Sequence, residues 1–91
     1  MQVSKKNLEI RNALSDFNRR VDEMHNEFSR FRHRETQKMP ECERLEKELV
    51  IYSRRKIFDL ELSSQLDRIL HKFQNRKKIW LRWVEEVHRA G

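Results

Sequence analysis

Residues that end or bend secondary structure are scarce in this sequence, which has one glycine, one proline and one cysteine among 91 residues. Strands joined by tight turns need glycine and proline, so the composition argues against a sheet. The lone Cys42 excludes an internal disulfide and favours a reducing, intracellular compartment, cytoplasmic or nuclear. No apolar run reaches the roughly 18 residues of a membrane span, and the N-terminus lacks the apolar region of a signal peptide.

Charged residues are abundant instead, at 40% of the chain, while hydrophobic residues make up 36%. Globular proteins are usually about 25% charged, and such an excess is typical of long helices with solvated faces. Disorder is disfavoured because aromatic and aliphatic residues recur at regular spacing. The length fits one small helical domain over residues 1–91, and the net charge of +6 makes an acidic partner plausible.

The first half of the chain carries a heptad pattern, in which apolar residues recur at alternating steps of four and three. Arginine and lysine close this segment, and cations suit the C-terminal end of a helix. The pattern predicts a helix over about 4–38, with its apolar stripe at Ile10, Leu14, Phe17, Val21, Met24, Phe28 and Phe31.

The second half begins after Pro40, which disfavours helix at the residue before it and suits the start of a new helix. The sequence therefore predicts a turn near 39–40 and a second helix over about 41–89. Its heptad phase slips between Tyr52 and Leu62, which indicates a stutter or a break between 53 and 61. A stutter is favoured because no glycine or proline marks a break. The apolar positions are Cys42, Leu45, Leu49, Tyr52, Leu62, Leu66, Ile69, Phe73, Trp80, Trp83, Val87 and Ala90.

These two segments predict an all-α fold, a long antiparallel helical hairpin of coiled-coil type. In that hairpin, facing residues have numbers that sum to about 79, so that Phe17 meets Leu62. The alternative is one kinked helix that pairs in parallel with a second copy. It requires Pro40 inside a helix, which costs about 3 kcal/mol.

The hairpin leaves the end of the second helix uncovered, because that helix is longer than the first by about three to four turns. This overhanging amphipathic segment holds both tryptophans, and an exposed apolar face of this kind favours an interface with another protein. The alternatives are a tail that folds back as a third helix and a helix at a membrane surface, which Glu85 and Glu86 disfavour. The predicted partner-binding residues are Ile79, Trp80, Trp83, Val84 and Val87.

Three further apolar residues, Val50, Ile57 and Leu60, lie off the main stripe. Either they widen the core around the stutter, or they form the side on which a second hairpin packs to complete a four-helix bundle. A two-helix hairpin buries little apolar surface by itself, so completion by oligomerisation is expected.

Little in the sequence suggests catalysis. The four histidines lack the i, i+4 pairing that places two imidazoles on one helix face, and there is no glycine-rich phosphate loop. We therefore expect no enzyme activity, no metal and no cofactor. Under the hairpin, basic residues from both ends of the chain come together beside the tail, where phosphates or an acidic protein could bind. These residues are Lys5, Lys6, Arg76, Lys77 and Lys78.

The predicted function is a non-enzymatic protein–protein interaction or assembly subunit, which self-associates or completes a multi-helix complex through the tryptophan face. A basic helical nucleic-acid-binding module ranks second. Membrane binding ranks last.

Overall fold

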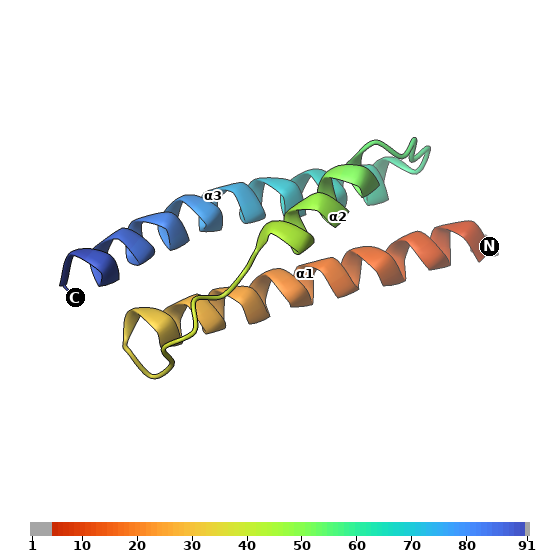
Figure 1. Ribbon diagram of the computed structural model, residues 1–91. Helices are drawn as coiled ribbons and strands as arrows, with labels where there is room; N and C mark the ends of the chain where they lie inside the picture. The colour runs from red at the N-terminus through yellow and green to blue at the C-terminus, as the bar shows by residue number, and fades with distance from the viewer. Residues whose placement is uncertain (1–4, 91) are drawn as a thin grey trace.

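The computed structural model describes residues 5–90 and contains three helices: α1 (Lys5–Arg32), α2 (Glu43–Ser53) and α3 (Leu60–Ala90) (Figure 1). No strand occurs in that range, so the all-α prediction is confirmed. The molecule is a rod of 56 × 19 × 17 Å. No helix in 5–90 combines the length and apolar character needed to cross a bilayer.

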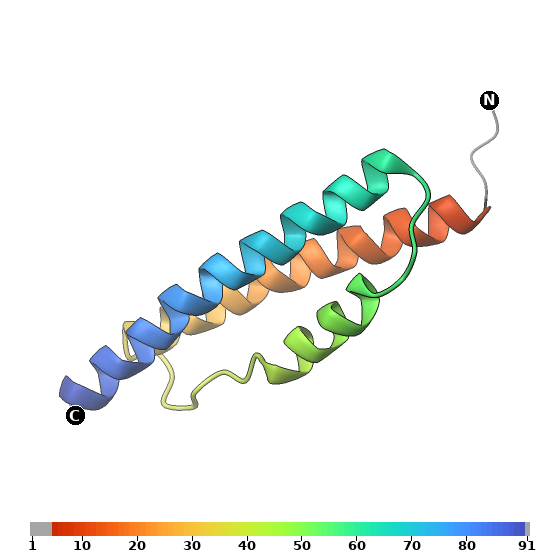
Figure 2. The same cartoon turned by 90° about the horizontal axis from the view of Figure 1, so that it is seen from above.

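The two long helices, α1 and α3, lie side by side and run in the same direction (Figures 1 and 2). Their contacts advance together along both chains. Lys72 Nζ lies 2.6 Å from Asp22 Oδ1, and Trp80 donates a hydrogen bond of 3.0 Å to His25. Near the C-terminal ends, Arg32 pairs with a glutamate of α3's last turns, Glu86, at 3.4 Å. The helices are therefore parallel.

The short α2 runs antiparallel to both neighbours. The rings of Phe17 and Tyr52 meet edge to face at 5.4 Å, and Arg20 bonds to Glu48, so residue numbers fall along α2 as they rise along α1. An ion pair of 2.7 Å between Lys77 and Glu46 ties α2 to α3. The chain thus forms an up–down–up arrangement of three helices.

The predicted two-helix hairpin is therefore wrong in its pairing. Phe17 packs with Tyr52 as its ring partner, and Leu62 belongs to a helix that runs parallel to α1. The predicted single helix over 41–89 is also wrong, because residues 54–59 connect two separate helices. The break, the alternative to a stutter, is what occurs.

Aspartate caps the helix that follows this break. The Asp59 Oδ1 atom accepts a hydrogen bond of 3.0 Å from the backbone N–H of Leu62, and the Asp59 carbonyl accepts one of 2.9 Å from Ser63. An aspartate at the N-cap satisfies donors that the first turn of a helix leaves free. The break thus follows from a capping residue, with no need for glycine or proline.

Helix α1 ends at Arg32, six residues before the predicted end at Lys38. The backbone N–H of Glu35 bonds to the Arg30 carbonyl at 2.9 Å, and that of Arg34 to the Phe31 carbonyl at 3.1 Å. These two bonds form a Schellman motif, in which the chain turns out of the helix through a left-handed residue. Here that residue is Arg34, with φ of 61°. The predicted turn near 39–40 is correspondingly a longer connection over 33–42.

The core lies where the three apolar stripes meet, and the stripes follow the predicted heptad spacing except at Ala90, which is exposed; Tyr52, Trp83 and Val87 are partly buried. In α1 every predicted position is buried except Met24, which is partly buried. The buried hydrophobic residues are Ile10, Leu14, Phe17, Val21, Phe28, Phe31, Cys42, Leu45, Leu49, Leu62, Leu66, Ile69, Phe73 and Trp80. Sequence spacing therefore identified the core faces correctly, although it paired them wrongly.

Candidate functional site

Trp80, predicted as a docking residue, is part of the core and is only 1% exposed. Its ring stacks on Phe28 with centroids 4.8 Å apart, and Phe73 meets it edge-on at 5.8 Å. Its indole Nε1 donates to Nδ1 of His25 at 3.0 Å. The prediction that Trp80 lies on an uncovered overhang is wrong, because α1 runs parallel to α3 and covers it.

His25 is held in its neutral form by these surroundings. Burial lowers the pKa of the imidazole, and the nearby charge of Arg76 lowers it further. The Nδ1 atom accepts the tryptophan hydrogen bond and so cannot carry a proton while that bond exists. The ring also lies 5.2 Å from that of Trp83. His25 is thus a packing and hydrogen-bonding residue between α1 and α3.

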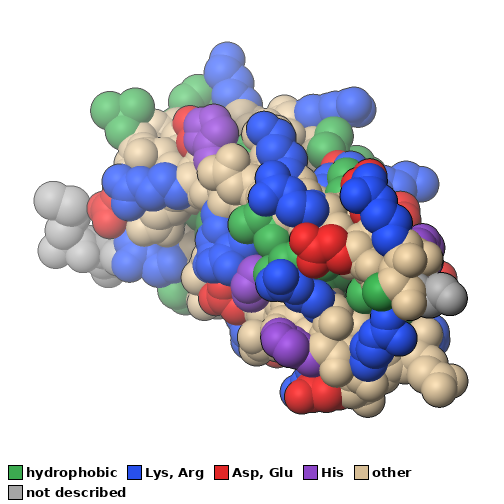
Figure 3. All heavy atoms as spheres, turned by 90° about the vertical axis from the view of Figure 1, so that its left-hand side faces the viewer, with side chains coloured by type: hydrophobic (Ala, Val, Ile, Leu, Met, Phe, Trp, Pro, Cys, Tyr) green, Lys and Arg blue, Asp and Glu red, His purple; other side chains and the backbone are tan. Residues whose placement is uncertain are grey.

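The other predicted partner-binding residues are half-buried. Trp83 and Val84 pack against the core, and the Arg32 guanidinium lies 5.0 Å from the Trp83 ring. Ile79 and Val87 are also of intermediate exposure. Lys and Arg side chains are spread over this end of the rod, with some hydrophobic side chains exposed among them (Figure 3). A role in partner binding stays a prediction for these four residues.

The predicted basic cluster does not form. Lys5 and Lys6 begin α1, at the end of the rod where α3 also begins. Residues 76–78 lie further along the rod, beside the part of α1 that contains Asp22 and His25, because Lys72 pairs with Asp22 and Trp80 bonds to His25. At 1.5 Å per residue, the two groups lie about 25 Å apart along the rod. Lys77 is moreover bound to Glu46, which raises its pKa.

The most exposed large apolar side chains lie around the connection between α2 and α3. Phe58 is 77% exposed and Leu60 is 86% exposed. The outer face of α2 adds Val50 and Ile51, and Leu8 lies at the same end of the rod near the start of α1 (Figure 1). We call Leu8, Val50, Ile51, Phe58 and Leu60 the connection surface.

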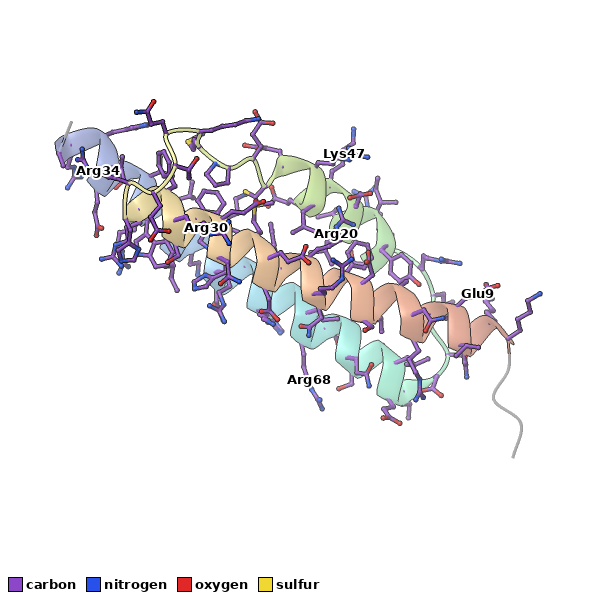
Figure 4. All side chains as sticks on the ribbon, turned by 90° about the horizontal axis from the view of Figure 1, so that it is seen from below. Glu9, Arg20, Arg30, Arg34, Lys47 and Arg68 are labelled. Carbon is purple, nitrogen blue, oxygen red and sulfur yellow. The ribbon has the colours of Figure 1, made fainter. Side chains whose placement is uncertain are left out.

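Basic residues accompany the connection surface. Arg54, Arg55 and Lys56 are all exposed in the connection, and Lys47 extends from α2 away from α1 (Figure 4). The Lys56 ammonium lies 5.5 Å from the centre of the Phe58 ring. Two sequence signals mark this site: the phase slip after Tyr52 and the off-stripe apolar residues Val50 and Leu60.

The remaining titratable and nucleophilic groups include those that a metal site or a reactive thiol would use. Within residues 5–90 no three histidine, cysteine or carboxylate side chains gather as metal ligands would. The Cys42 thiol is buried, and burial raises its pKa, which disfavours the reactive thiolate. A hollow between α1 and the 33–42 connection is lined by Glu27, Arg30, Thr36, Lys38, Met39, Pro40 and Glu41.

No family model, no curated protein and no solved structure matches this chain.

Proposed function

We propose that this chain is a non-enzymatic interaction subunit, which joins a protein complex through the connection surface. The observation that supports this function is the exposure of Phe58 and Leu60, at 77% and 86%. An aromatic side chain carries about 150–250 Å² of surface, so Phe58 alone leaves on the order of 150 Å² in water. Contiguous apolar patches larger than a few hundred Å² are rare on monomers and mark interaction sites.

The bundle does not need these residues for its own packing. Its three apolar stripes already meet in a core that runs from Ile10 to Trp80. Phe58 follows the end of α2 and Leu60 opens α3, so neither lies on the stripe that begins at Leu62. Burial of both side chains in a partner would favour association without a change in the fold.

A nucleic-acid-binding role draws less support from the contacts. Two lysines on α3 are paired with carboxylates: Lys72 with Asp22, and Lys77 with Glu46. The aromatic ring that the sequence placed beside the basic tail, Trp80, is buried and cannot stack on bases. Nucleic-acid binding therefore ranks second, as it does in the prediction from the sequence.

The experiment that tests the proposed function compares the double variant F58S/L60S with the matched control L81S. Leu81 is also exposed, at 55%, but lies on α3 far from the connection. The tagged full chain is purified from its source cells, and its partners are quantified by mass spectrometry. We expect a stoichiometric partner to accompany the wild type and L81S and to be lost from F58S/L60S.

Both variants change exposed residues, so their melting temperatures should stay within a few degrees of wild type, since exposed substitutions usually alter stability by about 0.5 kcal/mol or less. Retention of the same partners by F58S/L60S would refute the proposal. So would a wild-type chain that is monomeric at all concentrations and carries no stoichiometric partner.

A further inference from the structure

The outer face of α2 carries a short apolar stripe with a cation at each end. Lys47, Val50 and Ile51 lie on one side of α2 at the spacing i, i+3, i+4, and Arg54, the C-cap residue just after the helix, continues the spacing at i+7. Val50 is 41% exposed and Ile51 is 56% exposed, while Leu49 on the opposite side is 1% exposed. Figure 4 shows Lys47 pointing away from α1. The stripe is therefore free on the surface of the bundle.

The connection that follows continues the same combination of apolar and basic residues. Arg54, Arg55 and Lys56 are consecutive and exposed, and Phe58 follows two residues later. Two of these cations lie over aromatic rings, Arg55 over Tyr52 at 5.0 Å and Lys56 over Phe58 at 5.5 Å. The positive charge thus borders the apolar side chains directly.

Two acidic residues of this region bond to groups of the bundle, whereas Glu9 beside Leu8, Glu43 one turn before Lys47, and Glu61 are exposed. Glu48 is hydrogen-bonded to Arg20, which lowers the pKa of its carboxyl. Asp59 caps α3 through the N–H of Leu62, and Glu61 is the one further acid between 47 and 61. Lys47 and the three consecutive cations make no ion pair within residues 5–90. The connection surface is therefore left with unpaired positive charge.

We infer that the occupant of the connection surface is an acidic amphipathic helix of a partner protein; this inference rests on the proposed function. The apolar side of such a helix would cover Ile51 and Phe58, and its carboxylates would pair with Arg54 to Lys56. A docking amphipathic helix uses apolar residues at i, i+3, i+4 and i+7 as its anchors, and Val50, Ile51 and Phe58 supply exposed apolar side chains for such anchors to contact. Complementary charge adds orientation and partner selectivity.

A second copy of the chain fits this surface less well. A symmetric dimer places the same patch of both copies in contact, so the cations of one copy would face those of the other. Like charges across an interface oppose association. The charge that attracts an acidic helix thus disfavours self-association through the same face.

The inference is tested with two synthetic helices of roughly 20 residues that share the same leucine positions. One carries glutamate at the remaining surface positions and the other carries lysine. Binding to the full-length chain is measured by fluorescence anisotropy at about 0.1 M salt. We expect the glutamate helix to bind at least about tenfold more tightly than the lysine helix and than a glutamate peptide of scrambled order.

Variants of the chain then locate the binding. F58S/L60S should weaken the glutamate helix about tenfold or more, whereas L81S should leave its affinity unchanged. Reversal of Arg54, Arg55 and Lys56 to glutamate should transfer the preference to the lysine helix. Reversal of Arg82 and Arg89, which lie near the end of α3, is the charge control and should leave the preference unaltered.

Equal affinity for the two helices, or a preference that survives the reversal at 54–56, would overturn the inference. Binding of phosphatidylserine vesicles with the same dependence on Phe58, without binding of the helix, would assign the surface to a lipid. A mass that doubles with concentration and reverts in F58S/L60S would assign it to a second copy. If cellular partners are still lost from F58S/L60S while the helices fail, the proposed function stands and only the partner's chemistry is wrong.

Discussion

Replacement of Trp80 by alanine should strongly destabilise the protein, because this residue joins α1 to α3. Its side chain is 1% exposed, stacks on Phe28 at 4.8 Å and meets Phe73 at 5.8 Å. Truncation of a buried tryptophan to alanine costs about 3–5 kcal/mol, because transfer energy is lost and a cavity remains. The substitution also removes the hydrogen bond to His25.

This cost is large relative to the stability of so small a domain. At about 0.05–0.15 kcal/mol per residue, the free energy of unfolding is about 5–14 kcal/mol. A domain of this size loses about 4–8 °C of melting temperature per kcal/mol, so W80A should melt about 12–40 °C lower than wild type. If the stability lies at the low end, the variant will be largely unfolded at room temperature.

Circular dichroism during heating measures this loss, and the solution mass is determined on the same samples. Two further variants separate the contributions. W80F keeps a ring against Phe28 but loses the indole N–H, and should cost about 1 kcal/mol from the hydrogen bond in addition to the smaller ring. W83A removes a half-buried residue and should cost about 1–2 kcal/mol.

The reasoning would be refuted if W80A melted within a few degrees of wild type. It would be refuted with equal force if W80A and W83A had the same effect, because their burial differs. A variant that kept its helical content and lost only an oligomeric mass would restore Trp80 as an interface residue.

Three other measurements test separate parts of the structure. The folded-state pKa of His25 is lowered by burial and by Arg76 and Lys72, with Asp22 opposing. The stability from the neutral imidazole should therefore be full above the ordinary pKa of about 6.5 and be lost as the pH falls through the lower folded pKa. Between about pH 7.5 and pH 5, the melting temperature of wild type should decrease more than that of H25A. A zero-length carbodiimide should join Lys72 to Asp22 within one chain, which mass spectrometry detects and an antiparallel pairing of α1 with α3 forbids. R34G should raise the free energy of unfolding by about 1 kcal/mol, because glycine adopts the left-handed conformation of residue 34 without the steric cost to an L-residue. An unchanged or lower melting temperature would show that Arg34 is not strained.

The core faces could be predicted from the sequence because burial follows the heptad period. Ile10, Leu14 and Phe17 fall on one stripe whatever helix covers it, and all three are buried. The partner of each stripe could not be obtained in the same way. A periodic stripe fits a parallel neighbour as well as an antiparallel one, and 40% charged residues provide opposite charges in many registers.

The helix ends were missed because they use residues other than glycine and proline. Arg34 adopts the left-handed conformation that glycine usually provides at the end of a helix. The predicted stuttered helix contains Asp59 in its interior, whereas this residue is the N-cap of α3. An aspartate directly before the resumed apolar spacing is the signal in the sequence that marks the start of this helix.

The change from a two-helix to a three-helix fold moves the unsatisfied apolar surface from one end of the rod to the other. A hairpin with a long second helix leaves Trp80 without a neighbour, and the parallel α1 supplies that neighbour through Phe28. To bring α3 back alongside α1, the chain must cross the other end of the rod through residues 54–59. Phe58 and Leu60 lie at that crossing, outside every stripe, and nothing within residues 5–90 covers them to the extent that the core residues are covered. The expectation of an interaction subunit therefore keeps its physical basis, which is apolar surface beyond what one bundle buries, although the tryptophan that first suggested it belongs to the core.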